Sequence, residues 1–317
     1  MKVKLGVYVP VYGGWLRGVE NEDNEASYSY AEKCVQMAEE IGINSIWVAD
    51  HLLNPIKGPS SGSLEAWTLL TALAAKTKSV ELFHTTLCQG FRYPAVLAKM
   101  GATLDDISQG RFRFSIGAGW FEQEFRAYGA PWHDHDTRIE RAREQIEIIK
   151  SLWTQEVTDY KGKFFEIKGG ILEPKPIQKP HPPIWWGGQS QKSRMLAADL
   201  ADGWLMGAST LEESKDKIAD MRNLLEERNR DDLMYAIPGR VYIGDSDDAA
   251  KDYLKGLVGD NVSLYNSVIG RGFIGSPETI VDRIGLLEDQ GFTYVIFRIS
   301  PALDTLNKIE QHILPLL

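Results

Sequence analysis

Several features that would assign this chain to a common protein class are scarce or missing. Only two of its 317 residues are cysteines, too few for a disulfide framework and more typical of a protein from a reducing compartment. No apolar run is long enough to span a bilayer, and no signal-peptide pattern precedes the first apolar stretch. We therefore expect a cytoplasmic protein that does not enter a membrane.

Positive charge is scarce as well. The chain has 35 Lys and Arg residues against 44 Asp and Glu residues, a formal net charge of −9. A nucleic-acid-binding protein usually carries a basic surface, so we expect no nucleic-acid partner. Hydrophobic residues make up 43% of the chain and charged residues 25%, which is typical of a folded protein with a large core.

Common catalytic motifs are also missing. The sequence has no nucleophile elbow, no zinc-protease motif and no P-loop. His133 and His135 fit no common zinc spacing and have no evident third ligand, so we expect no metal site. The segment 10–15, after the first apolar run, does not match the glycine fingerprint of a dinucleotide-binding sheet.

Short apolar runs alternate with amphipathic stretches along the whole chain, which is typical of parallel βα units. The predicted strands are Lys4–Val9, Ser45–Ala49, Val80–Leu87, Phe112–Ile116, Ile184–Trp186, Gly203–Met206, Ala236–Ile243 and Tyr294–Ile299. The predicted helices are Tyr28–Ile41, Leu64–Thr77, Pro94–Ser108, Thr137–Trp153, Gln191–Leu200, Leu211–Asn229, Ser246–Leu257, Pro277–Gln290 and Leu306–Ile313.

Eight such units can close into a barrel or open into a doubly wound sheet. The missing dinucleotide fingerprint favours the barrel, and 317 residues suit an α/β (β/α)8 TIM barrel with insertions. We therefore expect one domain over residues 1–317. Residues 54–63, 158–183 and 259–275 are long for simple connections, and we expect such insertions at the C-terminal mouth of the barrel.

Two of the predicted strands end in glycines and lead into a helix. Gly117–Trp120 ends one of them, and Gly187–Ser190 ends the other. Glycines let backbone N–H groups approach an anion, and the helix N-terminus attracts negative charge. Ser190 can cap its helix and donate to a phosphate. The pattern fits either a site for a phosphate-bearing cofactor or an ordinary capped turn.

The charged residues near these turns leave alternatives open. Arg138 and Arg141 lie on one helical face and either hold a phosphate or pair with neighbouring glutamates. His51 follows the second predicted strand, where a histidine serves as acid, base or cofactor contact or has a structural role. His84 lies within the third predicted strand and points either into the barrel or towards a helix.

Together these segments resemble the bacterial luciferase-like superfamily of flavin- and deazaflavin-dependent oxidoreductases. The resemblance covers nearly the whole chain. It rests on the order and spacing of segments 46–51, 93–112, 117–120, 138–153, 160–165, 187–190, 201–204 and 274–277. It implies a barrel that binds FMN or a deazaflavin at its C-terminal mouth, with the flavin phosphate at the Gly187–Ser190 turn.

Within the superfamily, residues 9–17 and 28–30 resemble the two-component monooxygenases that act on alkanesulfonates, dimethylsulfone or pyrimidines. This resemblance implies a monooxygenase that uses reduced FMN and molecular oxygen on a small organic substrate. It further implies a separate flavin reductase as partner, a homo-oligomer, and a closable pocket with aromatic groups such as Tyr12, Trp15 and Trp120.

Matching to that group adds Ser115, Glu124 and Ser190 as flavin contacts, although Ser115 replaces a common asparagine and a tyrosine expected near Ile139 is absent. The predicted cofactor-binding residues are then Ser115, Gly117, Gly119, Trp120, Glu124, Arg138, Arg141, Gly187, Gly188, Gln189 and Ser190.

The catalytic candidates are His51, Arg240, Tyr242 and Arg271. Arg240 and Tyr242 fall on an arginine and a histidine of the alkanesulfonate enzymes, and the change to tyrosine weakens a sulfonate assignment. Arg271 falls in a long connection, where it matches a mobile arginine that closes such sites.

Asp50-His51 resembles the deazaflavin branch instead, whose matching histidine lies beside the hydride-transfer position. Two other functions therefore remain open beside the monooxygenase. One is a reductase or dehydrogenase that uses the 8-hydroxy-5-deazaflavin coenzyme. The other is a flavin-binding protein without catalysis, which would lack the polar groups that His51, Arg240 and Arg271 bring to the barrel.

Overall fold

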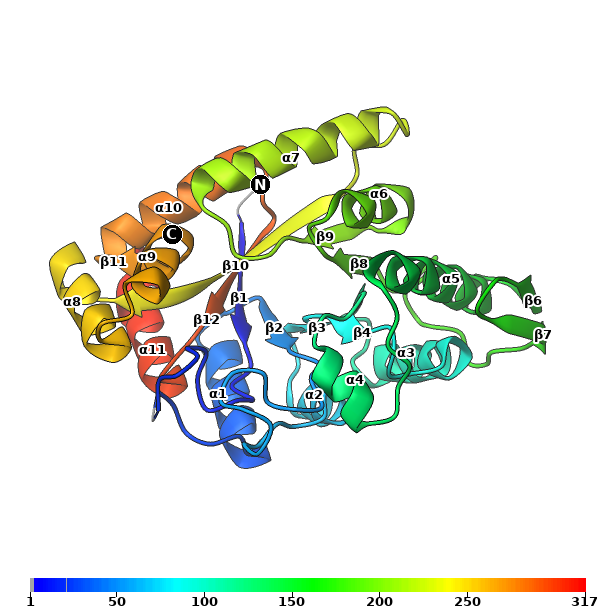
Figure 1. The fold of residues 1–317 in the computed structure, drawn as a ribbon, viewed down its shortest axis with the longest axis horizontal. Coiled ribbons are helices and arrows are strands. Elements are labelled where there is room, and N and C mark those ends of the chain that lie inside the picture. Colours follow the sequence, from blue (N-terminus) through cyan, green and yellow to red (C-terminus); the bar gives the residue numbers. More distant parts are fainter. Residues whose placement is uncertain (1–2, 21) are drawn as a thin grey trace.

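The computed structural model describes residues 3–20 and 22–317 and is built around a closed barrel of eight parallel strands (Figure 1). Around the barrel the strands follow the order β12-β1-β2-β3-β5-β8-β9-β10, and pairing of β10 with β12 closes it. The strands are β1 (Lys4–Tyr8), β2 (Ser45–Val48), β3 (Glu81–His84), β5 (Phe112–Gly117), β8 (Ile184–Gly187), β9 (Gly203–Leu205), β10 (Met234–Ile243) and β12 (Tyr294–Arg298). The predicted barrel is confirmed, and each barrel strand overlaps its predicted range.

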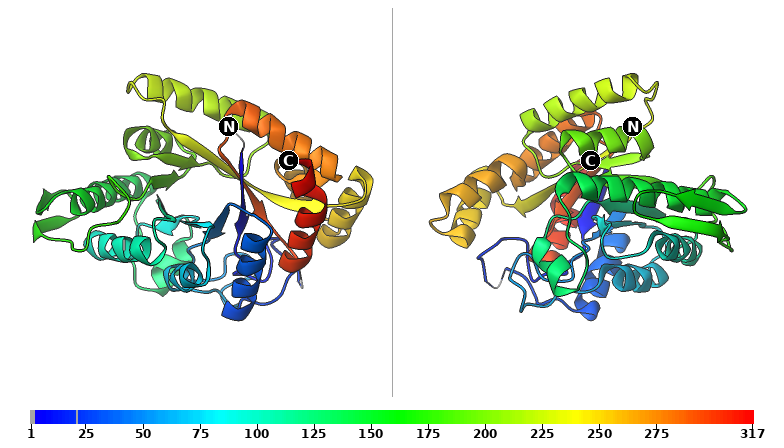
Figure 2. Two further views of the ribbon diagram at one scale, coloured as in Figure 1. Left: turned by 180° about the vertical axis from the view of Figure 1, so that it is seen from behind. Right: turned by 45° about the vertical axis from the view of Figure 1, so that its right-hand side comes forward.

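Helices surround the barrel, as the views from three sides show (Figures 1 and 2). They are α1 (Tyr28–Glu40), α2 (Ala66–Lys76), α3 (Pro94–Ile107), α5 (His135–Thr154), α6 (Gln191–Leu200), α7 (Leu211–Glu226), α8 (Asp247–Val258), α10 (Pro277–Gln290) and α11 (Ala302–Lys308). Side-chain caps fix several of their starts, such as Ser190 on α6 and Ser276 on α10, because a serine oxygen accepts an otherwise unpaired N–H of the first turn. In the described ranges no helix is long and apolar enough to cross a bilayer.

Aromatic side chains fill the barrel below its mouth. The rings of Trp47 and Phe83 stack with centroids 3.8 Å apart, and Trp185 and Tyr294 pack edge-on against them at 5.4–6.1 Å. Neighbouring residues of a strand point to opposite faces, so His84, next to Phe83, points outwards and stacks on Trp67 of α2 at 5.0 Å. Burial lowers the pKa of His84 to about 3. His84 therefore packs as a neutral ring between barrel and helix.

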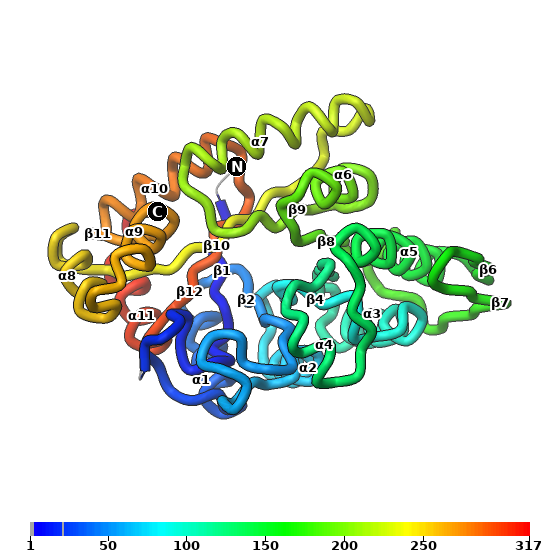
Figure 3. Tube along the Cα trace, viewed as in Figure 1, coloured from blue at the N-terminus to red at the C-terminus, as the bar shows by residue number. Residues whose placement is uncertain are grey.

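The long connections contain secondary structure that the sequence patterns did not predict. Residues 158–183 include a hairpin of β6 (Thr158–Lys161) and β7 (Glu166–Gly170), which lies next to α5 (Figure 3). Residues 259–275 contain α9 (Val262–Arg271) and the short strand β11 (Phe273–Gly275), which pairs with β10. The prediction that Arg271 lies in a loop is therefore wrong: Asn261 caps α9, and Arg271 is its last residue.

Candidate active site

A cavity of about 370 Å³ lies at the carboxyl ends of the barrel strands. We call it the mouth cavity. Residues that end or follow seven of the barrel strands line it, together with Pro238 from within β10. Nine predicted site residues are among the lining residues: His51, Gly117, Gly119, Trp120, Glu124, Arg138, Gly187, Gly188 and Gln189. Gly117, Gly188, His51 and Arg240 were all predicted to lie towards the C-terminal mouth; the first three line the cavity, whereas Arg240 does not.

The end of β8 leads into the N-terminus of α6 on one side of the mouth cavity. Gly188 has φ +155°, and a Cβ atom there would lie 2.1 Å from Oγ of Ser193, so only glycine fits. Ser190 caps α6 by accepting the N–H of Ser193 at 3.2 Å. Ser190 itself is exposed and does not line the cavity, whereas Ser193 does. The turn thus presents backbone and a helix N-terminus to the cavity, an arrangement that favours anions.

Arg138 of α5 lines the same cavity. Its guanidinium lies 3.9 Å from the ring centroid of Trp132 and donates to the carbonyl of His133. Its buried Nε has no hydrogen-bond partner in the described part of the chain. A buried donor without a partner is costly, and a phosphate oxygen would satisfy it.

Glycines also form the wall where β5 and β8 end. A Cβ atom on Gly117 would lie 2.4 Å from Oγ1 of Thr86, and one on Gly187 would lie 2.6 Å from its Cγ2. Side chains are thereby excluded at both strand ends. The wall is therefore made of backbone and of the Thr86 side chain that packs against both glycines and itself lines the cavity.

His51 is held by a carboxylate that comes from a helix absent from the sequence prediction, α4 (Glu122–Ala127). Nδ1 of His51 lies 2.9 Å from Oε1 of Glu124, and Oε2 of Glu124 accepts the N–H of Leu52 at 3.0 Å. With Glu124 ionised, Nδ1 carries the hydrogen and Nε2 is left as the second functional atom of the ring. Glu124 therefore orients His51. Both carboxylate oxygens of Glu124 already accept hydrogen bonds, from His51 and from the N–H of Leu52.

Asp50, next to His51, fixes the neighbouring loop. Its carboxylate accepts two hydrogen bonds from Arg92, at 2.8 and 3.0 Å, and a third from the N–H of Cys88 at 2.8 Å. A bidentate pair of this kind is geometrically specific. It ties the end of β2 to the segment that follows β4 (Leu87–Cys88).

Several predicted residues lie outside the mouth cavity. Ser115 is buried within β5, and its Oγ has no partner among the described residues. Arg141 lies 5.0 Å from the ring centroid of Phe165, beside a separate surface hollow. Arg240 donates from Nη2 to the carbonyl of Trp15 at 2.6 Å. Arg271 forms an ion pair with Glu213 of α7 at 2.9 Å, which keeps its charge away from the cavity.

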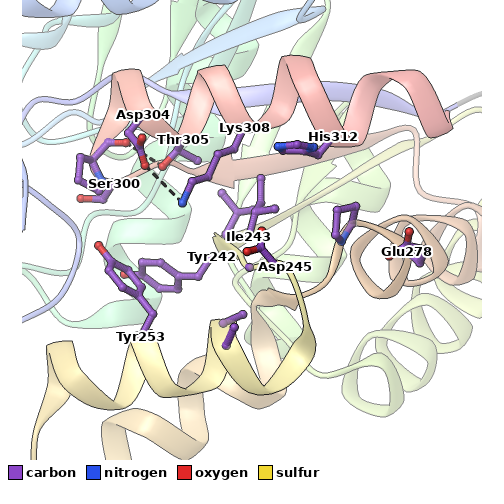
Figure 4. A pocket seen from close by; sticks show the side chains of 16 residues that line it. Tyr242, Ile243, Asp245, Tyr253, Glu278, Ser300, Asp304, Thr305, Lys308 and His312 are labelled. Atoms are coloured by element: carbon purple, nitrogen blue, oxygen red, sulfur yellow. Dashed lines mark hydrogen bonds and ion pairs between the residues drawn. The ribbon is translucent and has the colours of Figure 1, made fainter.

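Tyr242 lines a second cavity, of about 480 Å³, between α8, α10 and α11. Figure 4 shows Tyr242 and Tyr253 facing the α11 residues Asp304 and Lys308. The hydroxyl of Tyr242 donates to Glu22 at 3.2 Å. The structure thus does not bring Tyr242 or Arg271 to the mouth cavity, because each is engaged elsewhere.

The polar residues of the mouth cavity that were missed include Thr86, Ser193 and Arg298. Arg298 ends β12, and a charged residue at the carboxyl end of a barrel strand is a recognisable signal. Of the three aromatic side chains predicted for the pocket, only one is found to line it. Trp120 lines the cavity, whereas Tyr12 and Trp15 are buried, with Trp15 donating from Nε1 to the carbonyl of Ile299 at 3.1 Å.

Comparison with protein families matches residues 11–267 to the model described as luciferase-like monooxygenase. The chain is 26% identical over 352 aligned residues to the FMNH2-dependent dimethylsulfone monooxygenase of Pseudomonas putida, covering 99% of this chain and 95% of the relative. It is 33% identical to the pyrimidine monooxygenase of Allorhizobium ampelinum, covering 65% of this chain and 56% of the relative.

Solved structures share the fold at low sequence identity. EDTA monooxygenase from a Chelativorans species superposes with a TM-score of 0.86 at 17% identity, covering 100% of this chain and 93% of the other. An F420-dependent secondary alcohol dehydrogenase superposes with a TM-score of 0.80 at 21% identity, covering 99% and 98%. The same barrel therefore occurs both in a monooxygenase and in an F420-dependent dehydrogenase.

Proposed function

Because the chain belongs to the luciferase-like monooxygenase family, we propose that it is a monooxygenase that uses reduced FMN and molecular oxygen on a small organic substrate. The relative from Pseudomonas putida, similar along 99% of this chain, is named as FMNH2-dependent. The structural observation that carries the proposal is the mouth cavity, in which a glycine wall adjoins a helix N-terminus and a buried arginine donor.

The residues of the cavity suit both the phosphate and the planar ring of FMN. Gly188, Gln189 and the first turn of α6 would hold the phosphate together with Arg138, whose Nε lacks a partner among the described residues. The glycine wall of Gly117 and Gly187 would accept the planar ring. Reduced FMN, when bound, supplies the electrons that activate oxygen, so the protein contributes binding, orientation and exclusion of water.

Aromatic rings at the rim of the cavity provide the means to exclude water. Trp120 is 56% exposed and stacks on Phe121 at 5.3 Å. It also meets the ring of His51 at 5.3 Å and the guanidinium of Arg17 at 5.6 Å. A bound substrate can cover Trp120 and bury its exposed surface. Closing such a site limits side reactions with water.

We further propose that the protein receives reduced FMN from a separate flavin reductase and acts as a homo-oligomer in the cytoplasm. The proposal of a reductase follows from the relative of Pseudomonas putida, which is named as FMNH2-dependent. A free reduced flavin reacts with oxygen, so a second protein has to supply it continuously.

A deazaflavin-dependent reductase or dehydrogenase is the second candidate. It is favoured by His51, which faces the mouth cavity and is oriented through Nδ1 by Glu124. The fold is also that of an F420-dependent alcohol dehydrogenase. Such an enzyme would transfer hydride and need no oxygen.

An anaerobic binding titration separates the two candidates without knowledge of the substrate. We expect reduced FMN to bind at least tenfold more tightly than the reduced 8-hydroxy-5-deazaflavin coenzyme, a difference of about 1.4 kcal/mol. Protein fluorescence reports the binding, since Trp120 lines the cavity. Tighter binding of the deazaflavin would reverse the assignment.

Exchange of Ser190 for aspartate tests where the phosphate binds. Aspartate caps a helix as well as serine does, so α6 should stay intact. The new carboxylate would stand at the exposed start of α6 and repel the phosphate by about 1 kcal/mol, and we expect FMN to bind severalfold more weakly. Ser190→Asn keeps the cap without charge and is the control. Equal affinity of both variants for FMN would place the phosphate elsewhere.

A further inference from the structure

The surface hollow beside Arg141 adjoins the segments that border the mouth cavity. It has a volume of about 570 Å³, and among the described residues it shares none with the mouth cavity. Leu52 and Gln89 line the hollow. The residues just before them in the chain line the mouth cavity, so the two spaces share a wall. We call it the aromatic hollow, because five aromatic side chains line it: Phe91, Tyr93, Tyr128, Phe164 and Phe165.

Two of these aromatic side chains are unusually exposed. Tyr93 is 75% exposed and Tyr128 is 58% exposed. Tyr93 meets the ring of Phe165 edge-on at 6.3 Å, and the hydroxyl of Tyr128 donates to the carbonyl of Leu52 at 3.1 Å. Most of the surface of both tyrosines is thus left to solvent. Exposed apolar surface that gathers in one place marks binding sites.

Arg141 of α5 brings a positive charge with free donors to the hollow. Its guanidinium lies 5.3 and 5.0 Å from the ring centroids of Phe164 and Phe165, which attract it through their π-systems. Nε of Arg141 donates to Oε1 of Gln89 at 3.3 Å. Within residues 3–20 and 22–317, Nη1 and Nη2 of Arg141 have no hydrogen-bond partner and no carboxylate at ion-pair distance.

The charged side chains around Arg141 are engaged with other groups. Glu144, three residues later on α5, accepts the N–H groups of residues 163–165 at 2.7–3.1 Å. Burial lowers the pKa of Arg141, and the charge of Glu144 offsets this only in part. Arg92 also lines the hollow, but two carboxylates bind its guanidinium. Arg141 is therefore the arginine of the hollow that can bind an anion.

The walls of the hollow are fixed by two neighbouring residues of α5. The buried side chain of Gln145 donates to the carbonyls of Gln89 and Arg92 at 2.9 and 3.0 Å. Glu144 holds the turn on the other side through the three N–H groups. Arg141 lies on the same helical face and contacts both walls. A site that is already formed loses less entropy when a ligand binds.

We propose that the aromatic hollow binds a small aromatic carboxylate, whose ring packs against the exposed tyrosines and whose carboxylate group binds Arg141. A guanidinium presents paired N–H donors that match a carboxylate, and aromatic rings pack favourably against one another. The ligand would bind outside the cavity in which FMN is proposed to bind, since the two spaces share no described lining residue. The inference is therefore independent of the proposed function.

A titration followed by ligand NMR tests the site with benzoate as the probe. The references are benzamide, which lacks the charge, and cyclohexanecarboxylate, which lacks the aromatic ring. We expect wild type to bind benzoate about tenfold more tightly than benzamide and about threefold more tightly than cyclohexanecarboxylate. Arg141→Met should remove the preference over benzamide. Tyr93→Ser, at a mostly exposed position, should remove the preference over cyclohexanecarboxylate.

Two further variants serve as controls. Arg138 lies three residues before Arg141 on α5 but lines the mouth cavity, so Arg138→Met should bind benzoate as wild type does. Arg141→Lys keeps the charge without the paired donors. It should retain part of the preference over benzamide, also if the methionine variant folds poorly.

The proposal is overturned if wild type binds benzoate no more tightly than benzamide, or if both Arg141 variants keep the full preference. It is also overturned if Arg138→Met loses benzoate binding and Arg141→Met keeps it, because benzoate would then occupy the mouth cavity. We expect Arg141→Met to bind FMN as wild type does. Weaker FMN binding with unchanged benzoate binding would assign Arg141 to the cofactor instead.

Discussion

Replacement of Arg92 by methionine is expected to lower the free energy of unfolding by about 3–5 kcal/mol. Arg92 supplies two of the three hydrogen bonds of Asp50, whose side chain is buried. Without Arg92 a buried carboxylate would keep only the N–H of Cys88. Breaking a buried ion pair on one side is costly because the remaining charge is desolvated and unpaired. Chemical denaturation followed by tryptophan fluorescence measures the change.

A surface pair gives the matched control for this prediction. Arg126 binds Glu122 one helical turn away, and both are exposed, so Arg126→Met should cost about 0.3–0.5 kcal/mol. The double variant Asp50→Asn with Arg92→Met removes the stranded charge and should recover part of the lost stability. A loss below about 1 kcal/mol for Arg92→Met would contradict the prediction. It would mean that water hydrogen-bonds to the Asp50 carboxylate in place of Arg92.

Replacement of His51 by alanine should separate the two candidate functions by a large effect. In a monooxygenase that uses reduced FMN, we expect oxygen to be consumed still, with a larger share released as hydrogen peroxide, because a gap beside Trp120 admits water. In a deazaflavin reductase, loss of an acid–base group should lower turnover by about a hundredfold or more. Product and peroxide are measured with each reduced cofactor in turn.

Glu124→Gln is the matched variant for His51. Glutamine keeps an acceptor for Nδ1 of His51, which lies 2.9 Å from Oε1 of Glu124, but removes the charge. We expect a smaller rise in peroxide than with His51→Ala. Substrate turnover with the deazaflavin alone, abolished in His51→Ala, would contradict the FMN assignment.

The barrel could be predicted from the sequence because its signals are local and repeated. Apolar runs such as Val80–Leu87 alternate with helices whose starts carry serine or proline, and α10 (Pro277–Gln290) was predicted to the residue. Apart from α9, the unpredicted elements are short. The hairpin β6–β7 and the helix α4 carry too few residues for a period to be recognised, and α4 supplies Glu124.

Site residues could be predicted where they directly follow a strand. Pairs of side chains from distant parts of the sequence could not be predicted. The glycines of both strand ends and His51 were found by position, since parallel strands bring their carboxyl ends together. The pairing of His51 with Glu124, and of Asp50 with Arg92, joins segments far apart in the chain.

Oxygen-isotope labelling tests the central claim most directly. The protein is supplied with reduced FMN and labelled molecular oxygen, together with a panel of small carboxylates, sulfonates, organosulfur compounds and pyrimidines. We predict that the oxidised product carries one oxygen atom from molecular oxygen, and that no product forms without oxygen. A product that lacks the label and forms equally well in the absence of oxygen, with the reduced or oxidised deazaflavin as cofactor, would contradict the assignment.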